Sequence, residues 1–224
     1  MKCDFIKTQT IKDKLYYNRT QMVEVQIDYP FILSSHYPNS MTFNTFYRQK
    51  ARNQYRYASS KLYREAVKHY NSSKEQGFPF HSYVYNGVFE VTYCKKPFIS
   101  LYSDVYEFTG GAHGMTTRSS DTWDLKNNRI MELCSLFKKG FNYKYFMLEF
   151  IEAEAKRRKI TGKADYFDNL KANIVKHFDE KNYYLTEKGI AIFYPLYTIA
   201  PYSTGIQVFV IPYPLFGSNL VYKF

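Results

Sequence analysis

The stretch Phe108-Thr109-Gly110-Gly111-Ala112-His113-Gly114 decides the fold, because it places three glycines within five positions. A β-type sequence ends before it at Tyr106-Glu107, and another follows it up to Trp123-Asp124-Leu125. Glycine tolerates positive φ and close approach of another segment, so this composition predicts a tight corner between two strands. The residues expected to hold this glycine corner are Gly110, Gly111, Ala112 and Gly114.

Before the glycine corner, the sequence predicts one long amphipathic helix. Its apolar residues recur every three or four positions, and Ser40 is available as its N-cap. The apolar positions are Phe43, Tyr47, Ala51, Tyr55, Ala58, Leu62, Ala66 and Tyr70.

The remaining segments complete an α+β pattern. Met22 to Tyr29 alternates with period two and stops at Pro30, and further strands are expected between residues 83 and 125. Consecutive strands joined by short turns favour antiparallel pairing. Helices between residues 142 and 178 form a second helical layer, and a closing hairpin turns at Glu187-Lys188-Gly189. We predict an antiparallel sheet packed with a long amphipathic helix and a second helical layer, in halves of residues 1–115 and 116–224 that pack as one compact unit.

Charge and aromatic content point to a binding surface. The 224 residues include 31 Lys and Arg against 20 Asp and Glu, so the formal net charge is +11 and favours anionic partners. Tyr and Phe number 24 and 19, more than a core requires, so many tyrosines are expected at the surface. Free use of Tyr in a β-rich protein is the alternative explanation.

The cysteines and the first residues bear on location. Cys3, Cys94 and Cys134 are odd in number and widely spaced, which predicts reduced, mostly buried thiols and neither a zinc site nor a disulfide framework. No apolar run suits a membrane span, and Met1 to Lys7 lacks the core of a secretory signal. We therefore expect a cytoplasmic chain, or one whose leader has been removed.

The helix carries the densest patch of one charge sign. Arg48, Arg52 and Arg56 are spaced by four residues, and Lys61, Arg64 and Lys68 follow them. A solvated helix face is the ordinary explanation of such a run. The functional hypothesis is that Arg48, Arg52 and Arg56 contact an anionic ligand.

His113 is the residue most open to a catalytic interpretation. Its neighbours in sequence include no obvious partner acid, and a metal site with Asp121 or Asp124 lacks a supporting pattern. A structural bond from its ring to a backbone carbonyl is therefore favoured over catalysis. We expect no enzymatic activity, no cofactor and no metal, and we retain His113 as a candidate ligand-binding residue.

A second corner is expected late in the chain. In Ala200-Pro201-Tyr202 the proline fixes φ, Gly205 closes the turn, and Tyr202 anchors the loop through its hydroxyl group. The functional alternative is a recognition rim that this loop shares with the glycine corner, since binding residues concentrate on loops.

Six segments together carry a family resemblance. They are Pro30, Asn44, Phe108 to Gly114, Asp124 to Arg129, Leu133 to Phe137, and Tyr197 to Gly205. With them the chain resembles the family in which DUF4163 is followed by DUF3298, an RsiV-like module of the type that precedes the catalytic part of PdaC-type deacetylases. Phe108, Asn128 and Thr198 depart from the family pattern, where Tyr, Gly and an acidic residue are usual.

The resemblance implies recognition and not catalysis, in a cell-envelope setting, because such modules form lysozyme-sensing ectodomains and non-catalytic parts of peptidoglycan deacetylases. Lysozyme is disfavoured as the partner here, since two strongly basic proteins repel each other. We expect an anionic protein surface or cell-wall polymer instead. One alternative is a cytoplasmic protein that binds nucleic acid or acidic proteins, although no nucleic-acid signature is present. Another is a glycan-active hydrolase accessory domain, for which Glu107 with Asp104 or Asp121 are the candidate carboxylates.

Overall fold

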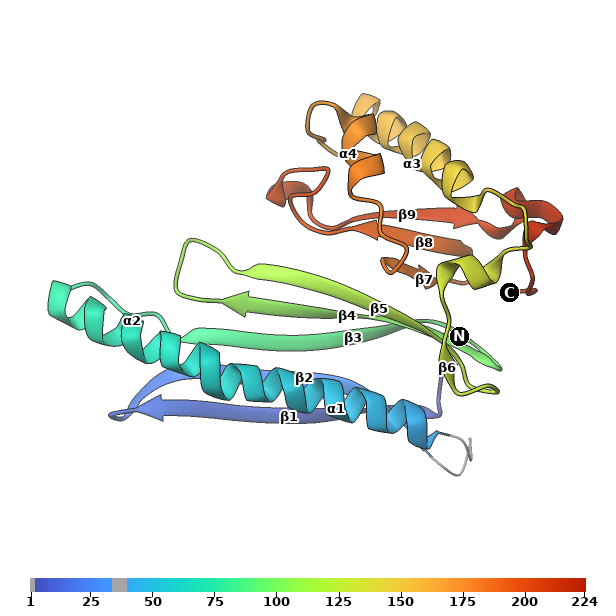
Figure 1. Cartoon of the computed structure of the whole chain (residues 1–224). Helices are drawn as coiled ribbons and strands as arrows, with labels where there is room; N and C mark the ends of the chain where they lie inside the picture. Colours follow the sequence, from blue (N-terminus) through green and yellow to red (C-terminus); the bar gives the residue numbers. More distant parts are fainter. Residues whose placement is uncertain (1–2, 34–39) are drawn as a thin grey trace. The chain divides into compact units, whose positions relative to one another are not determined.

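The structure is a computed structural model that describes residues 3–33 and 40–224 (Figure 1). It confirms the α+β class. The chain forms two compact units, the first from Met1–Glu90 with Ser103–Arg118 and the second from Val91–Tyr102 with Ser119–Phe224. The halves expected at residues 1–115 and 116–224 stay a prediction.

A six-stranded sheet runs in the order β1 to β6. Its strands are β1 (Ile6–Tyr17), β2 (Thr20–Ile32), β3 (Tyr83–Lys95), β4 (Phe98–Phe108), β5 (Met115–Asp124) and β6 (Arg129–Ile130). Strands β1 and β2 pair antiparallel, but β2 and β3 pair parallel. The expected antiparallel sheet is therefore mixed, with one parallel pair, because the long helix between β2 and β3 returns the chain to the same end of the sheet.

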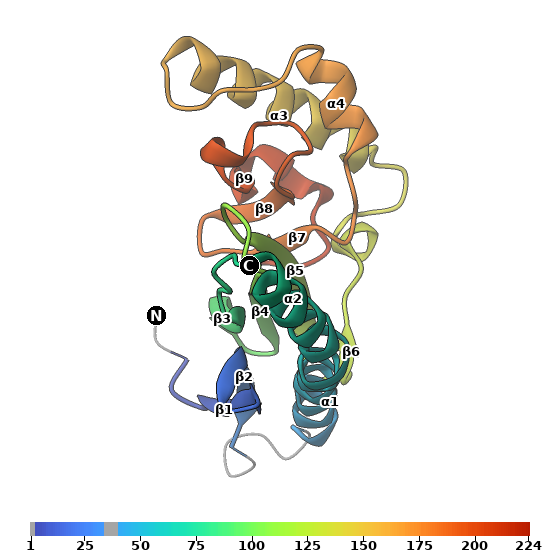
Figure 2. The same ribbon diagram turned by 90° about the vertical axis from the view of Figure 1, so that its left-hand side faces the viewer.

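The long helix is continuous from α1 (Met41–Tyr57) through a π-helical turn (Ala58–Leu62) to α2 (Tyr63–Gln76). It lies along one face of the first unit's sheet (Figures 1 and 2). The alternating residues Val23, Val25 and Ile27 of β2 pack against it and are at most 1% exposed. Hydrophobic burial between these two layers forms the core of the first unit.

The π-helical turn explains how one helix stays on the sheet over this length. Ala58, Leu62 and Ala66 are fully buried and follow one another in steps of four, whereas an α-helix repeats every 3.6 residues. One wider turn absorbs the drift that two such steps produce. Ser60 supports the turn by donating its hydroxyl hydrogen to the Arg56 carbonyl oxygen.

The start of the helix is fixed by Asn44 and not by Ser40. The Ser40 side chain makes no capping hydrogen bond, so that expectation is wrong. Asn44 is buried, and its amide accepts from the Ile32 backbone nitrogen at 2.8 Å and donates to the Ile32 carbonyl oxygen at 2.9 Å. The asparagine thereby completes the hydrogen bonding of the last β2 residue and ties the helix to that strand.

The second unit contains the second helical layer. Helices α3 (Tyr143–Ile160) and α4 (Leu170–Lys176) cover one face of a three-stranded antiparallel sheet (Figures 1 and 2). Its strands are β7 (Tyr183–Leu185), β8 (Gly189–Tyr194) and β9 (Gln207–Pro212), and short 3₁₀ helices lie at Leu133–Leu136, Tyr202–Thr204 and Tyr213–Asn219. The expected hairpin between β7 and β8 is present. A Cβ atom at Gly189 would clash with the Ile211 carbonyl of β9, so this strand contact requires glycine.

The cysteines differ from the sequence expectation. Cys3 and Cys94 are each disulfide-bonded, and Cys134 is an exposed free thiol. The prediction of reduced, mostly buried thiols is therefore wrong for Cys3 and Cys94, whereas Cys134 is reduced as predicted but exposed. The spacing of cysteines in a sequence does not predict a disulfide bond, because its geometry depends on the fold and not on separation along the chain.

Candidate functional site

Helix α1 carries three basic residues in a row along its axis, Arg48, Arg52 and Arg56, called the basic stripe. All three are exposed. A spacing of four residues places them on one helix face at intervals of about 6 Å. Within residues 3–33 and 40–224, no carboxylate pairs with any of the three guanidinium groups. The basic stripe therefore offers three charges that the described structure leaves uncompensated.

The glycine corner joins β4 to β5, as the sequence predicts, and two of its glycines have clear structural reasons. Gly110 has a φ of 82°, and a Cβ atom there would lie 3.1 Å from the His69 imidazole of helix α2. At Gly114 a Cβ atom would clash with the Tyr106 ring and lie 2.6 Å from the Glu107 carbonyl oxygen. Gly110 thus allows the corner to pass helix α2, and Gly114 allows it to pass strand β4.

The tip of the corner has no such packing reason. Gly111, Ala112 and His113 are exposed, and a Cβ atom at Gly111 would meet nothing within 4 Å. The His113 ring nitrogen Nδ1 lies 3.0 Å from the Gly114 carbonyl oxygen, which is the kind of backbone contact proposed from the sequence. No group of three or more metal-binding side chains occurs in the part of the chain that the structure describes. The role of His113 in ligand binding stays a prediction.

The carboxylates considered for hydrolysis have other partners. Asp104 accepts two hydrogen bonds from the Arg118 guanidinium, at 2.8 and 2.6 Å. The Tyr57 hydroxyl donates to Glu107 at 3.4 Å, and burial together with this carboxylate raises the pKa of Tyr57 to about 12. An acid held in a bidentate ion pair is poorly placed to exchange protons with a substrate.

Asp124 also has a structural role. It is buried, and its carboxylate accepts from the backbone nitrogens of Lys126 and Asn127 and from the Asn127 side chain. Asn128, which follows Asn127 in this turn, has a φ of 51°, the left-handed conformation that suits glycine. Asparagine tolerates this conformation better than most residues, which explains how it replaces the usual turn glycine.

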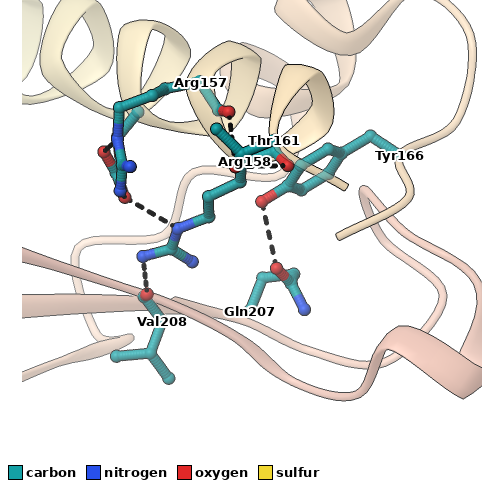
Figure 3. Close-up of polar contacts among 7 residues, drawn as sticks. Arg157, Arg158, Thr161, Tyr166, Gln207 and Val208 are labelled. Atoms are coloured by element: carbon teal, nitrogen blue, oxygen red, sulfur yellow. Dashed lines mark hydrogen bonds and ion pairs between the residues drawn. The ribbon is translucent and has the colours of Figure 1, made fainter. Parts of the chain in front are cut away.

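The loop from Tyr197 to Gly205 is held by hydrogen bonds from the Gln207 side chain. The buried Gln207 amide donates to the Thr204 and Gly205 carbonyl oxygens at 2.8 and 3.2 Å. Its own oxygen accepts from the Tyr166 hydroxyl at 3.1 Å (Figure 3). Gly205 has a φ of 76°, as the end of this turn requires.

Two tyrosines lie side by side on this loop. The Tyr197 and Tyr202 rings have centroids 5.6 Å apart, and Tyr197 is 47% exposed. Tyr197 has a φ of 62°, which is unusual for an aromatic residue and stores strain. Tyr197 is exposed and Tyr202 is half-buried, so this loop, with Pro201 and Tyr202, stays a candidate contact surface of the second unit.

The basic cluster at the end of α3 is compensated within the unit, unlike the basic stripe. Arg157 and Arg158 both donate to Glu154, at 2.7 and 2.9 Å for their Nε atoms. Arg158 also donates to the Val208 carbonyl oxygen and lies over the Phe209 ring. Hydrogen bonding from Arg157, followed by hydrogen bonding from Arg158, holds the pKa of Glu154 at about 2. This cluster therefore stabilises the second unit and is not a candidate site.

A hollow on the sheet of the first unit was not indicated by the sequence analysis. It encloses about 400 Å³ and is lined by Glu24, Gln26, Val84, Tyr85, Asn86 and Tyr106. The alternation of polar and apolar residues on β2 and β3 was visible, but a polar strand face looks the same in sequence whether it is flat or hollowed.

Comparison with protein families agrees with this arrangement. The model of Deacetylase PdaC matches residues 17–116, and the model of DUF3298, a protein of unknown function, matches residues 135–214. The chain combines a PdaC region with a DUF3298 region. The PdaC region ends just after the glycine corner, and the DUF3298 region contains the Tyr197 to Gly205 loop.

Two crystal structures of DUF3298 proteins share the fold. The protein from Bacteroides fragilis NCTC 9343 has 17% identity and a TM-score of 0.63, with 97% of this chain and 94% of that chain covered. The protein from Pseudomonas aeruginosa PAO1 has 18% identity and a TM-score of 0.62, with 96% and 94% covered. No curated protein matches the chain. Among the described helices, none is long and apolar enough to span a membrane.

Proposed function

We propose that this protein is a non-catalytic binding module that recognises an anionic partner, an acidic protein face or an anionic cell-wall polymer, through the basic stripe. The observation that supports this most is that Arg48, Arg52 and Arg56 are exposed without carboxylate partners among the described residues. Guanidinium groups about 6 Å apart suit a ligand with repeated negative charges, because each can bind a carboxylate or phosphate with two hydrogen bonds.

The overall charge acts in the same direction. A net charge of +11 attracts anions over a Debye length of about 8 Å at physiological salt and repels basic proteins. A basic lysozyme is therefore a poor partner for the basic stripe. The contrast with Arg157 and Arg158, which already share Glu154, favours the stripe over the other basic cluster.

The candidate catalytic side chains His113 and Asp104 already have partners within the protein, which supports a binding role over catalysis. His113 faces a backbone carbonyl oxygen, and Asp104 is held by Arg118. The disulfide-bonded Cys3 and Cys94 favour an oxidising compartment, since cytoplasmic thiols are kept reduced. Together with the PdaC and DUF3298 regions, this supports a module that works in the cell envelope.

The experiment compares charge reversal on the stripe with the same change elsewhere. The test variant is Arg48→Glu/Arg52→Glu/Arg56→Glu. The control variant Lys139→Glu/Lys163→Glu/Lys188→Glu alters the net charge equally at exposed positions of the second unit. Binding of polyphosphate and of polyglutamate is measured by calorimetry at physiological salt.

We expect the test variant to lose at least about tenfold in affinity, while the control loses a few-fold through net charge alone. Equal losses in both variants would sink the proposal, because the stripe would then be one solvated surface among others. If the native protein binds duplex DNA more tightly than either polymer, and the test variant loses this binding, the protein is a nucleic-acid-binding protein instead.

A further inference from the structure

The strongest feature outside the proposed function is the hollow on the sheet of the first unit, lined by Glu24, Gln26, Val84, Tyr85, Asn86 and Tyr106. Strands β2 and β3 are in parallel register there, with Glu24 beside Val84 and Gln26 beside Asn86. The alternate residues Val23, Val25 and Tyr85 belong to the core beneath the long helix. The polar side chains therefore stand on the sheet face that the helix does not cover.

Two side-chain amides in the hollow lack hydrogen-bond partners among the described residues. Within residues 3–33 and 40–224, neither Gln26 nor Asn86 makes a side-chain hydrogen bond, although both are only half exposed. Each primary amide offers two donors and an acceptor, and the Tyr106 hydroxyl offers one more donor and acceptor. The hollow thus presents an alternating set of donors and acceptors that water or a ligand must satisfy.

Charge in the hollow is close to neutral. Glu24 lies 3.7 Å from Lys14, so its negative charge is partly offset. An anionic ligand would meet this carboxylate, and a cationic one would find it already paired with Lys14. The lining therefore favours an uncharged ligand, in contrast to the basic stripe.

Backbone pairing narrows the choice further. Both β2 and β3 are interior strands with neighbours on each side, so a peptide cannot add to them as an extra strand. Recognition must use the side chains. Sugar hydroxyl groups both donate and accept, and the apolar faces of pyranose rings suit contact with a tyrosine ring. A volume of about 400 Å³ lies within the usual range for small-ligand sites.

We propose that this hollow binds a neutral oligosaccharide, with Gln26 and Asn86 bonding its hydroxyl groups and the Tyr106 ring packing against one sugar face. Gly114 gives the site its shape, because a side chain at that position would displace the Tyr106 ring. This links the glycine corner, the most distinctive motif of the sequence, to a binding surface. The hollow lies on the sheet of the first unit and the basic stripe lies on helix α1, so the two sites are tested separately.

The test titrates the full chain with chitotetraose and with cellotetraose and follows backbone amides by NMR. We expect binding of one or both sugars with a Kd between about 0.1 and 1 mM, and shifts concentrated at residues 24–26, 84–86 and 106. Shifts elsewhere, or none up to about 20 mM sugar, would overturn the proposal.

Variants locate the contribution of each group. Gln26→Ala/Asn86→Ala and Tyr106→Ala are each expected to weaken sugar binding at least about tenfold. Arg48→Glu/Arg52→Glu/Arg56→Glu is expected to bind the sugars as the native protein does, so failure of the sugar site and of the anion site are distinguishable. Unchanged affinity in the double variant would refute the assignment, and the NMR map of the native protein remains decisive if a variant does not fold.

Discussion

The ring of Tyr106 occupies the space that a side chain at position 114 would fill, so Gly114 fixes where this tyrosine lies. The corner between β4 and β5 turns back so closely that only a hydrogen atom fits between the two segments. One glycine of the motif therefore has a packing role that periodicity and composition could not specify.

Replacing Gly114 by Ala should destabilise the protein by about 1–3 kcal/mol, because the new methyl group meets both the Tyr106 ring and the Glu107 carbonyl oxygen. Gly111→Ala is the matched control, since a Cβ atom there meets nothing within 4 Å. Urea unfolding of both variants measures the difference. A Gly111→Ala loss as large as that of Gly114→Ala would show that the whole corner, and not this contact, requires glycine.

Asn128→Gly should stabilise the protein by about 0.5–1 kcal/mol. Asn128 has a φ of 51°, and its buried side-chain oxygen has no hydrogen-bond partner in the described structure. Asn128→Ala removes the same oxygen but keeps the strained backbone, so it should be less stable than Asn128→Gly by about 1 kcal/mol. Thermal unfolding distinguishes the two, and equal stability would contradict a backbone cause.

Glu154 should make the free energy of unfolding depend on pH in the acidic range. Its folded pKa of about 2 lies below the ordinary value of 4.5, so its contribution is complete above about pH 5 and is lost as the pH falls toward 2. The side chain is partly exposed, which limits the contribution to about 1 kcal/mol. Glu154→Gln should therefore be less stable than the native protein at pH 7 and nearly equal to it at pH 2. Glu75→Gln, on an exposed carboxylate of helix α2, serves as control. A Glu154→Gln deficit that persists at pH 2 would point to packing instead of charge.

Thiol titration tests the disulfide-bonded state. Protein purified without reductant and then denatured should expose one reactive thiol, that of Cys134, and reduction should raise the number to three. Three thiols before reduction would remove the main structural support for an envelope setting.

Much of the fold followed from periodicity. The helix between Phe43 and Tyr70, the alternating strand ending at Pro30 and the hairpin at Gly189 are local patterns, and local patterns report local structure. The parallel pairing of β2 with β3 was missed because it depends on where the helix returns the chain. The π-helical turn was missed because apolar steps of three and four suit an ordinary helix as well.

The candidate site was less accessible from sequence. The exposure of Arg48, Arg52 and Arg56 follows from their helix face, but the absence of carboxylate partners near them in the described residues required coordinates. The basic cluster of Arg157 and Arg158 looked similar in sequence and proved to be satisfied by Glu154. The hollow at Gln26 and Asn86 is lined by residues of three strands, and the pattern of a single strand does not record which residues its neighbours bring to it.

The central claim, recognition of an anion by the basic stripe, is tested most directly by the salt dependence of polyphosphate binding. The logarithm of affinity is plotted against the logarithm of salt concentration for the native protein and for Arg48→Gln/Arg52→Gln/Arg56→Gln. The account predicts a slope shallower by about two to three in the variant, because each lost contact releases about one counterion fewer. Parallel lines with equal slopes would show that these three arginines do not contact the ligand.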